Sequence, residues 1–131
     1  MKAERHPFLL DGKWVDEGER VEIRSPYDQT VVGETVRASR KQLEHAISAS
    51  VRAFEATRKA TSHERNRVLS AVAEGISRDR EGFARTIAQE AGKPIKTARA
   101  EVDRAIFTFT VAADESLRNE ASFCPWTCNR V

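Results

Sequence analysis

The chain has 131 residues, of which 40% are hydrophobic and 32% are charged, with a formal net charge of +2 at pH 7. This length suits one domain or a piece of one, and the composition is that of an ordered, helix-rich protein. Basic and acidic residues are mixed along the sequence, which excludes the concentrated positive field that nucleic acid or an anionic membrane requires. Charges interrupt each apolar run well short of a membrane span, and Phe8–Leu10 is too short for a secretion signal. We therefore expect a cytoplasmic protein without a nucleic-acid or membrane partner.

The first 36 residues predict short β-strands. Phe8–Leu10 and Lys13–Val15 flank Asp11-Gly12, a dipeptide that supplies the positive dihedral angles of a primed hairpin turn. Two more short strands are expected at residues 21–23 and 31–36, where hydrophobic residues recur between polar ones.

Four helices are predicted after the strands. Ser39 and Thr61 each precede a Gln or Glu by three residues, which is the capping-box pattern, and Asp79 is the expected cap of a third helix. A fourth helix should run from Pro94 to about Arg118. The apolar stripes of these amphipathic helices are Leu43, Ala46, Ile47, Ser50, Val51 and Phe54 in the first; Val68, Leu69, Val72, Ala73 and Ile76 in the second; Phe83, Ile87 and Ala88 in the third; and Ala98, Val102, Ala105, Ile106, Phe109 and Ala113 in the fourth.

The segment Glu90–Val102 should hold a sharp corner between the third and fourth helices. Gly92 accepts the left-handed backbone that follows a helix end, and Pro94 suits a first helical position. Gly92-Lys93-Pro94 does not fit a phosphate-binding P-loop, because Pro94 stands where that motif has a Ser or Thr for magnesium. The six glycines also form no Gly-x-Gly-x-x-Gly dinucleotide fingerprint. A packing corner is the interpretation that these patterns favour.

The cysteines and histidines form no recognisable site in the sequence. Cys124 and Cys128 could present two thiolates to a metal on a helix, but Pro125 disfavours that helix. A nucleophilic Cys124 would need a base and an oxyanion donor, and its neighbours offer no such arrangement. The three histidines are far from each other and from the cysteines, namely His6, His45 and His63.

Glu90 and Glu101 could form an acid/base pair, but the corner separates them, so capping or structural roles are favoured. We therefore assign no catalytic, cofactor-binding or metal-binding residue to this chain.

Several motifs resemble, in order, the opening part of the aldehyde dehydrogenase superfamily. Leu10-Asp-Gly-Lys-Trp-Val15 resembles the opening hairpin of that family, and residues 25–34, Ser-Pro-Tyr-Asp followed by Val-Val-Gly-Glu, resemble its next pair of strands. Residues 53–69 are similar to its first helix pair, and Glu-x-Gly-Lys-Pro at residues 90–94 is similar to its corner. The motifs are short, but their order and spacing are specific. The chain is identified as an N-terminal fragment of a family member, with the resemblance covering residues 8–121.

The resemblance implies an α/β parent fold with a Rossmann-type cofactor domain, of which residues 1–121 would be the N-terminal part. This part would be mainly α, with four helices after short N-terminal β-hairpins. Full-length members oxidise aldehydes to carboxylic acids with NAD or NADP, using a cysteine thiolate as nucleophile and a glutamate that activates water. Those motifs come later in the family's sequence, so Cys124 is not the family nucleophile. We expect this chain to bind no cofactor and to be inactive alone.

A truncated family member also has expected physical properties. Full-length members are usually homo-oligomers, and helices that lie against a parallel sheet in the parent fold would here keep exposed apolar stripes, so the isolated chain should self-associate. Residues 53–69 and 107–115 resemble most the branch that acts on small oxygenated aldehydes, such as lactaldehyde, phosphorylated glyceraldehyde or phosphonoacetaldehyde. The alternatives left open are a self-contained helical interaction module without catalytic activity and a small thiol or metal protein that uses the two cysteines.

The tail, residues 122–131, has no counterpart in the resemblance and gathers both cysteines beside a proline and a tryptophan. Its sequence Cys-Pro-Trp-Thr-Cys-Asn-Arg can be encoded so that starting one base earlier gives Leu-Pro-Leu-Asp-Leu-Gln-Pro. The shifted sequence resembles what this branch of the family carries next. We therefore predict that a frameshift after Phe123 produced the tail.

Overall fold

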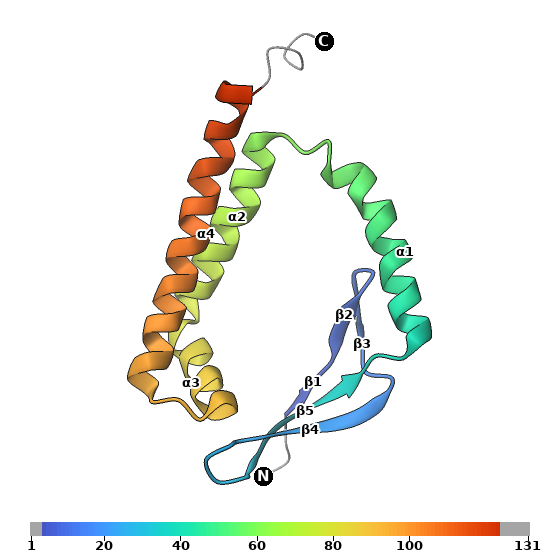
Figure 1. The fold of residues 1–131 in the computed structure, drawn as a ribbon, viewed down its shortest axis with the longest axis vertical. Helices are drawn as coiled ribbons and strands as arrows, with labels where there is room; N and C mark the ends of the chain where they lie inside the picture. Colours follow the sequence, from blue (N-terminus) through green and yellow to red (C-terminus); the bar gives the residue numbers. More distant parts are fainter. Residues whose placement is uncertain (1–3, 124–131) are drawn as a thin grey trace. The chain divides into compact units, whose positions relative to one another are not determined.

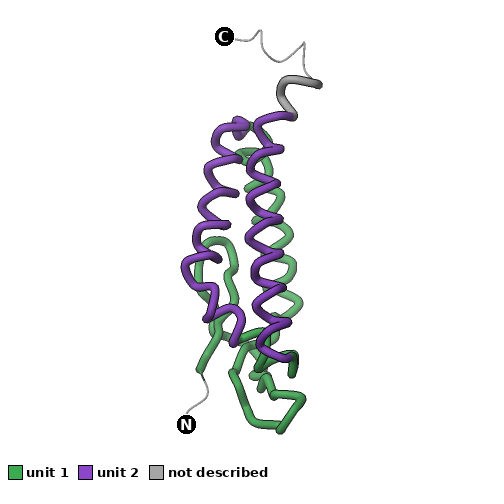
Figure 2. The backbone as a smooth tube through the Cα atoms, turned by 90° about the vertical axis from the view of Figure 1, so that its left-hand side faces the viewer, with its two compact units in different colours: residues 1–59, 86–93 green, residues 60–85, 94–131 purple. Residues whose placement is uncertain are grey.

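The computed structural model describes the backbone of residues 4–123 and the side chains of residues 4–118. The chain divides into two compact units, shown in separate colours in Figure 2. Unit 1 comprises residues 1–59 and 86–93, and unit 2 comprises residues 60–85 and 94–131. The described part is mostly helical after short N-terminal strands, as the sequence predicts (Figure 1).

Unit 1 begins with the predicted hairpin. Strands β2 (Phe8–Leu10) and β3 (Lys13–Val15) pair antiparallel, with Leu10 opposite Lys13. Asp11 and Gly12 connect them with φ angles of 49° and 76°. Both central residues of the turn thus have the positive φ of a type I′ turn, which confirms the prediction from the Asp-Gly dipeptide.

A three-stranded sheet in the order β1-β5-β4 completes the β part of unit 1. Strands β4 (Glu19–Arg24) and β5 (Val31–Arg37) pair antiparallel, as expected, and β1 (Arg5–His6) runs parallel to β5. The sequence did not predict β1, because a strand of two residues has no detectable period. Val36 on β5 is 6% exposed and belongs to the small core of this unit.

Helix α1 (Arg40–Thr57) follows β5 and begins at the predicted capping box. The Ser39 hydroxyl accepts a hydrogen bond from the Gln42 backbone N–H, while the Gln42 side chain accepts one from the Ser39 N–H. Ala49 is the buried residue of this helix. The larger members of the predicted stripe are between 57% and 66% exposed, namely Leu43, Ile47, Val51 and Phe54. Unit 1 itself therefore does not cover the face that the stripe marks.

Unit 2 is built on two long antiparallel helices, α2 (Ser62–Arg78) and α4 (Ile95–Phe123), which lie side by side in both Figures 1 and 2. The second predicted capping box, Thr61 with Glu64, is present at the start of α2. The Asn66 side-chain amide donates to the Ala113 carbonyl oxygen at 2.9 Å, and this bond fixes the register of the pair. The core is formed by small residues and one valine, namely Ala73, Ala84, Ala98, Val102 and Ala113.

Two predictions about these helices need correction. The apolar stripe of the second helix predicts that Val68 and Val72 are buried, but they are 60% and 37% exposed, because α4 covers the side of α2 that carries Ala73. The fourth helix was predicted to end near Arg118, whereas α4 continues to Phe123. Its sequence in this region contains no glycine or proline that would stop it.

Helix α3 (Arg80–Ala91) leads into the predicted corner, where Gly92 has a φ of 61°. The left-handed cap is therefore confirmed. Pro94 was predicted to be the first residue of the fourth helix, but α4 begins one residue later, at Ile95. The Pro94 carbonyl oxygen accepts the first hydrogen bonds of α4, from the backbone N–H groups of Thr97 and Ala98. This is the place of an N-cap residue rather than of the first helical residue.

Candidate functional site

The two carboxylates considered as an acid/base pair belong to different units. Glu90 belongs to unit 1 and Glu101 to unit 2, and neither unit contains both carboxylates. A Cβ atom added to Gly92 would lie 2.8 Å from Cγ of Pro26, also in unit 1. The close approach of this turn shows that Gly92 is needed for packing as well as for its backbone angle. The structure therefore supports a packing role for Gly92 at this corner.

Unit 1 has a cavity of about 250 Å³ between the sheet and the second half of α3. Its lining includes two carboxylates and an imidazole, because β1 and α3 both border it: Glu4, His6, Ile23, Val32, Gly33, Thr35, Thr86, Gln89 and Glu90. The His6 backbone carbonyl accepts a hydrogen bond from the Thr35 hydroxyl at 2.9 Å, which holds β1 at this edge. The sequence did not predict that His6 and Glu90 border one cavity, because β1, which carries His6, is too short to show a strand period.

A second polar cluster joins the hairpin turn to α1. The carboxylate of Asp11 lies 3.2 Å from Nε2 of His45 and 3.1 Å from Nη2 of Arg52. All three side chains are about half exposed or more. His45 is therefore tied to the turn, and Asp11 both forms and anchors the turn.

The strongest ion pairs of unit 2 join the start of α3 to α4. Nε and Nη2 of Arg80 donate to the two carboxylate oxygens of Asp103 at 2.6 and 2.7 Å. Arg99 makes a matching pair of bonds to Glu81 at 2.9 and 3.0 Å. The hydrogen bonds from these guanidinium groups hold the pKa values of Asp103 and Glu81 below their usual range. The network stabilises the helix junction in the charged state.

Among the described side chains, those of residues 4–118, no group of three or more His, Cys, Asp and Glu could hold a metal ion. The metal and nucleophile readings of Cys124 and Cys128 lie outside the described residues. Within the same described range, no helix is long and apolar enough to cross a membrane.

Among the described residues, no strand leads into a helix through a glycine-rich turn. The one strand that leads directly into a helix is β5, and its connection to α1 contains no glycine at which a backbone could approach a pyrophosphate. At the start of α1, the Ser39 hydroxyl engages the backbone N–H of Gln42, and the Gln42 side chain engages that of Ser39. No step of cofactor chemistry can be assigned to these residues.

Comparison with known proteins shows which family this chain belongs to. The sequence model described as "Aldehyde dehydrogenase family" matches residues 14–129. The chain belongs to the aldehyde dehydrogenase family. The matched range continues past residue 121, where we expect the family's sequence to end, and the frameshift itself stays a prediction about the gene.

Named aldehyde dehydrogenases are similar to this chain along most of its length. Lactaldehyde dehydrogenase of Methanocaldococcus jannaschii is 35% identical over 106 residues, which are 81% of this chain and 23% of that protein. 3-Sulfolactaldehyde dehydrogenase of Priestia aryabhattai is 28% identical over 117 residues, or 89% of this chain and 24% of that protein. This chain therefore spans about a quarter of the length of these relatives.

Solved aldehyde dehydrogenase structures have the same fold in this segment. Aldehyde dehydrogenase 21 of Physcomitrella patens, in complex with the reaction product succinate, superposes with a TM-score of 0.87 at 35% identity. The match covers 90% of this chain and 25% of that one. Betaine aldehyde dehydrogenase of Staphylococcus aureus, in complex with NAD⁺, gives a TM-score of 0.77 at 28% identity over 86% of this chain and 23% of that one.

Proposed function

We propose that this chain is the N-terminal segment of the cofactor-binding domain of an aldehyde dehydrogenase, and that the complete enzyme oxidises an aldehyde to a carboxylic acid with NAD or NADP. The observation that carries the proposal is the superposition on aldehyde dehydrogenase 21, which spans 90% of this chain but only 25% of that enzyme. The family nucleophile and base would lie in the part of the fold that has no counterpart here.

The segment alone is proposed to bind no dinucleotide and to turn over no aldehyde. Support comes from the connection between β5 and α1, which lacks glycine, and from the capping box that engages the Gln42 N–H in the first turn of α1. NAD⁺ is present in the Staphylococcus aureus betaine aldehyde dehydrogenase structure, which supports NAD as a cofactor of the complete enzyme. The contribution of this segment would be to supply helices and strands that complete the domain around the cofactor site.

The proposed substrate class is a small oxygenated aldehyde. Two of the similar proteins act, by their names, on lactaldehyde and 3-sulfolactaldehyde, both short aldehydes with an oxygen-bearing neighbour. This agrees with the branch that residues 53–69 and 107–115 resemble.

Calorimetry and a turnover assay on the pure 131-residue chain test the inactivity. We expect no saturable heat of binding with NAD or NADP and no aldehyde-dependent rise in NADH absorbance with lactaldehyde. Full-length lactaldehyde dehydrogenase of Methanocaldococcus jannaschii, assayed in parallel, is the positive control. Saturable cofactor binding or turnover by the pure chain would refute the proposal.

We further propose that the chain is cytoplasmic and binds no nucleic acid. We also propose that the isolated chain self-associates, because large apolar side chains are exposed on α1, α2 and α4. Light scattering and a hydrophobic dye measure the association directly. A sharp monomer that binds no dye and melts cooperatively would instead favour the helical interaction module.

A further inference from the structure

The turn between β2 and β3 contains a dipeptide that can rearrange covalently without an enzyme. Asp11 is the only aspartate of the chain that directly precedes a glycine. In such a pair the backbone nitrogen of the glycine can attack Cγ of the aspartate, because glycine has no Cβ atom to hinder the approach. The product is a five-membered succinimide ring, which water opens either to aspartate or to isoaspartate, whose main chain runs through Cγ.

This rearrangement needs no oxidant and no second substrate other than water. When the ring closes, a bond forms between Cγ of Asp11 and the Gly12 nitrogen. The hydroxyl of the neutral carboxyl group and the proton of the N–H leave together as water. When the ring opens to isoaspartate, water adds to the former backbone carbonyl carbon of Asp11, and the bond from that carbon to the nitrogen breaks. The nitrogen regains a proton, and the carbon becomes a new carboxyl group.

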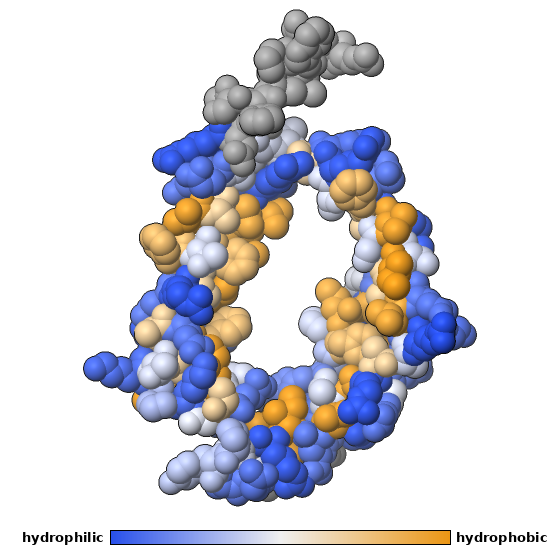
Figure 3. All heavy atoms as spheres, viewed as in Figure 1, coloured by the Kyte–Doolittle hydropathy of each residue, from blue (hydrophilic) through white to orange (hydrophobic). Residues whose placement is uncertain are grey.

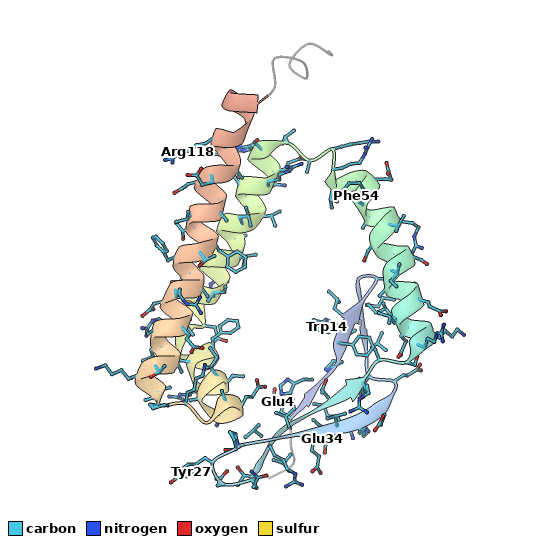
Figure 4. The ribbon with its side chains drawn as sticks, in the orientation of Figure 1. Glu4, Trp14, Tyr27, Glu34, Phe54 and Arg118 are labelled. Carbon is cyan, nitrogen blue, oxygen red and sulfur yellow. The ribbon has the colours of Figure 1, made fainter. Side chains whose placement is uncertain are left out.

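The structure leaves the turn open to water. The Asp11 side chain is 45% exposed, and the last pair of the β2–β3 ladder, Leu10 opposite Lys13, lies before the turn. Both turn residues border an open cleft of about 300 Å³ between the hairpin and α1. Figure 3 shows hydrophobic residues gathered along α1, and Figure 4 labels Trp14, on β3 just after the turn. Water can therefore reach a succinimide formed at Asp11.

Two side chains of α1 oppose ring closure, because they hold the carboxylate. Nε2 of His45 lies 3.2 Å, and Nη2 of Arg52 3.1 Å, from the same oxygen atom, Oδ2 of Asp11. The cationic guanidinium pairs with the ionised carboxylate, which is the form that a backbone nitrogen attacks least readily. The side chain must also leave both contacts before Cγ can turn toward the Gly12 nitrogen. The folded unit thus slows the reaction that the dipeptide favours.

We propose that Asp11 is a site of covalent modification, at which the chain isomerises to isoaspartate at a rate set by the contacts of the Asp11 carboxylate with His45 and Arg52. The modification adds a carbon atom to the main chain of a two-residue turn, whose length fixes the pairing register of the hairpin. It also attaches the carboxylate directly to Cα, which shortens its reach toward α1. Isomerisation therefore disturbs the hairpin and releases it from α1. This inference does not depend on the proposed function.

The experiment incubates the full chain at neutral pH and follows one peptide. Trypsin releases residues 6–13 as a single peptide, because Arg5 and Lys13 bound it. Isoaspartate changes the chromatographic retention of this peptide but not its mass. Incubation in water labelled with heavy oxygen gives a second readout, because each ring opening adds one labelled oxygen atom. We expect both signals in this peptide before they appear in a peptide with any other aspartate.

Substitutions on α1 test the protecting contacts. Arg52→Gln should raise the rate about two- to fivefold, the factor that corresponds to a half-exposed ion pair. Adding His45→Gln should raise it further. Arg40→Gln is the matched control, because it removes the same charge from α1 at a residue that pairs with Glu44 instead. Circular dichroism checks that each variant keeps its helix content.

A second comparison uses urea at a concentration that unfolds the chain. The wild type and Arg52→Gln should then react at the same rate, since the contacts exist only in the folded state. Absence of isoaspartate from the peptide of residues 6–13, or its earlier appearance at another aspartate, would overturn the modification site. A folded Arg52→Gln chain as slow as the wild type, an equal acceleration by Arg40→Gln, or a difference that persists in urea would overturn the role of the α1 contacts.

Discussion

The substitution Gly92→Ala should destabilise unit 1 through two separate effects. The φ of 61° at this residue costs about 1–2 kcal/mol for an L-residue with a Cβ atom. The new Cβ would also stand 2.8 Å from Cγ of Pro26, inside the ordinary carbon contact distance of about 3.5 Å. Overpacking of this kind adds about 1–3 kcal/mol. The expected loss in the free energy of unfolding is therefore about 2–5 kcal/mol.

Urea unfolding followed by circular dichroism measures this loss, with Gly75→Ala as the matched control. A Cβ at Gly75 meets nothing within 4 Å, and the residue lies in the interior of α2, so alanine should stabilise the chain by about 0.5–1 kcal/mol. Adding Pro26→Ala to Gly92→Ala should recover the steric part and leave the backbone part, with Pro26→Ala alone completing the cycle. A Gly92→Ala chain as stable as the wild type would refute both the strained angle and the close contact.

Further predictions concern the core, the ion pairs and the tail. Val102, which is 2% exposed, fills the core of unit 2, so Val102→Ala should cost about 2–3 kcal/mol in urea unfolding, and a loss below about 0.5 kcal/mol would contradict this packing. Since Arg80 lowers the pKa of Asp103 in the folded state, this pair stabilises above the ordinary Asp pKa near 3.8, and the contribution is lost as the pH falls through the lowered value. In the Asp103→Asn variant, the urea midpoint should consequently fall less than in the wild type as the pH is lowered. An equally steep fall in both proteins would count against the pairing. Replacing Cys124 and Cys128 by Ser should change only thiol reactivity. Sequencing the gene should reveal codons compatible with the shifted frame, and incompatible codons would eliminate the frameshift.

The sequence determined the features whose signals lie within a few residues of one another. Asp11-Gly12 specified the hairpin turn because these residues tolerate positive φ, and the turn has φ angles of 49° and 76°. Ser39 and Thr61 marked helix starts because their side chains satisfy amides only two or three residues away. Gly92 marked the corner for the same local reason, and the order of these motifs was sufficient to indicate the family.

The tertiary structure decided which apolar faces are covered and which distant side chains meet. The periodicity of α1 marks one broad apolar stripe, yet Ala49 is buried while Ile47 is exposed, since periodicity cannot say which neighbouring element packs against which part of the stripe. The contact of Asp11 with Arg52 and the pairing of Arg80 with Asp103 join residues 41 and 23 positions apart. Such contacts depend on how elements pack, and no local pattern in the sequence encodes them.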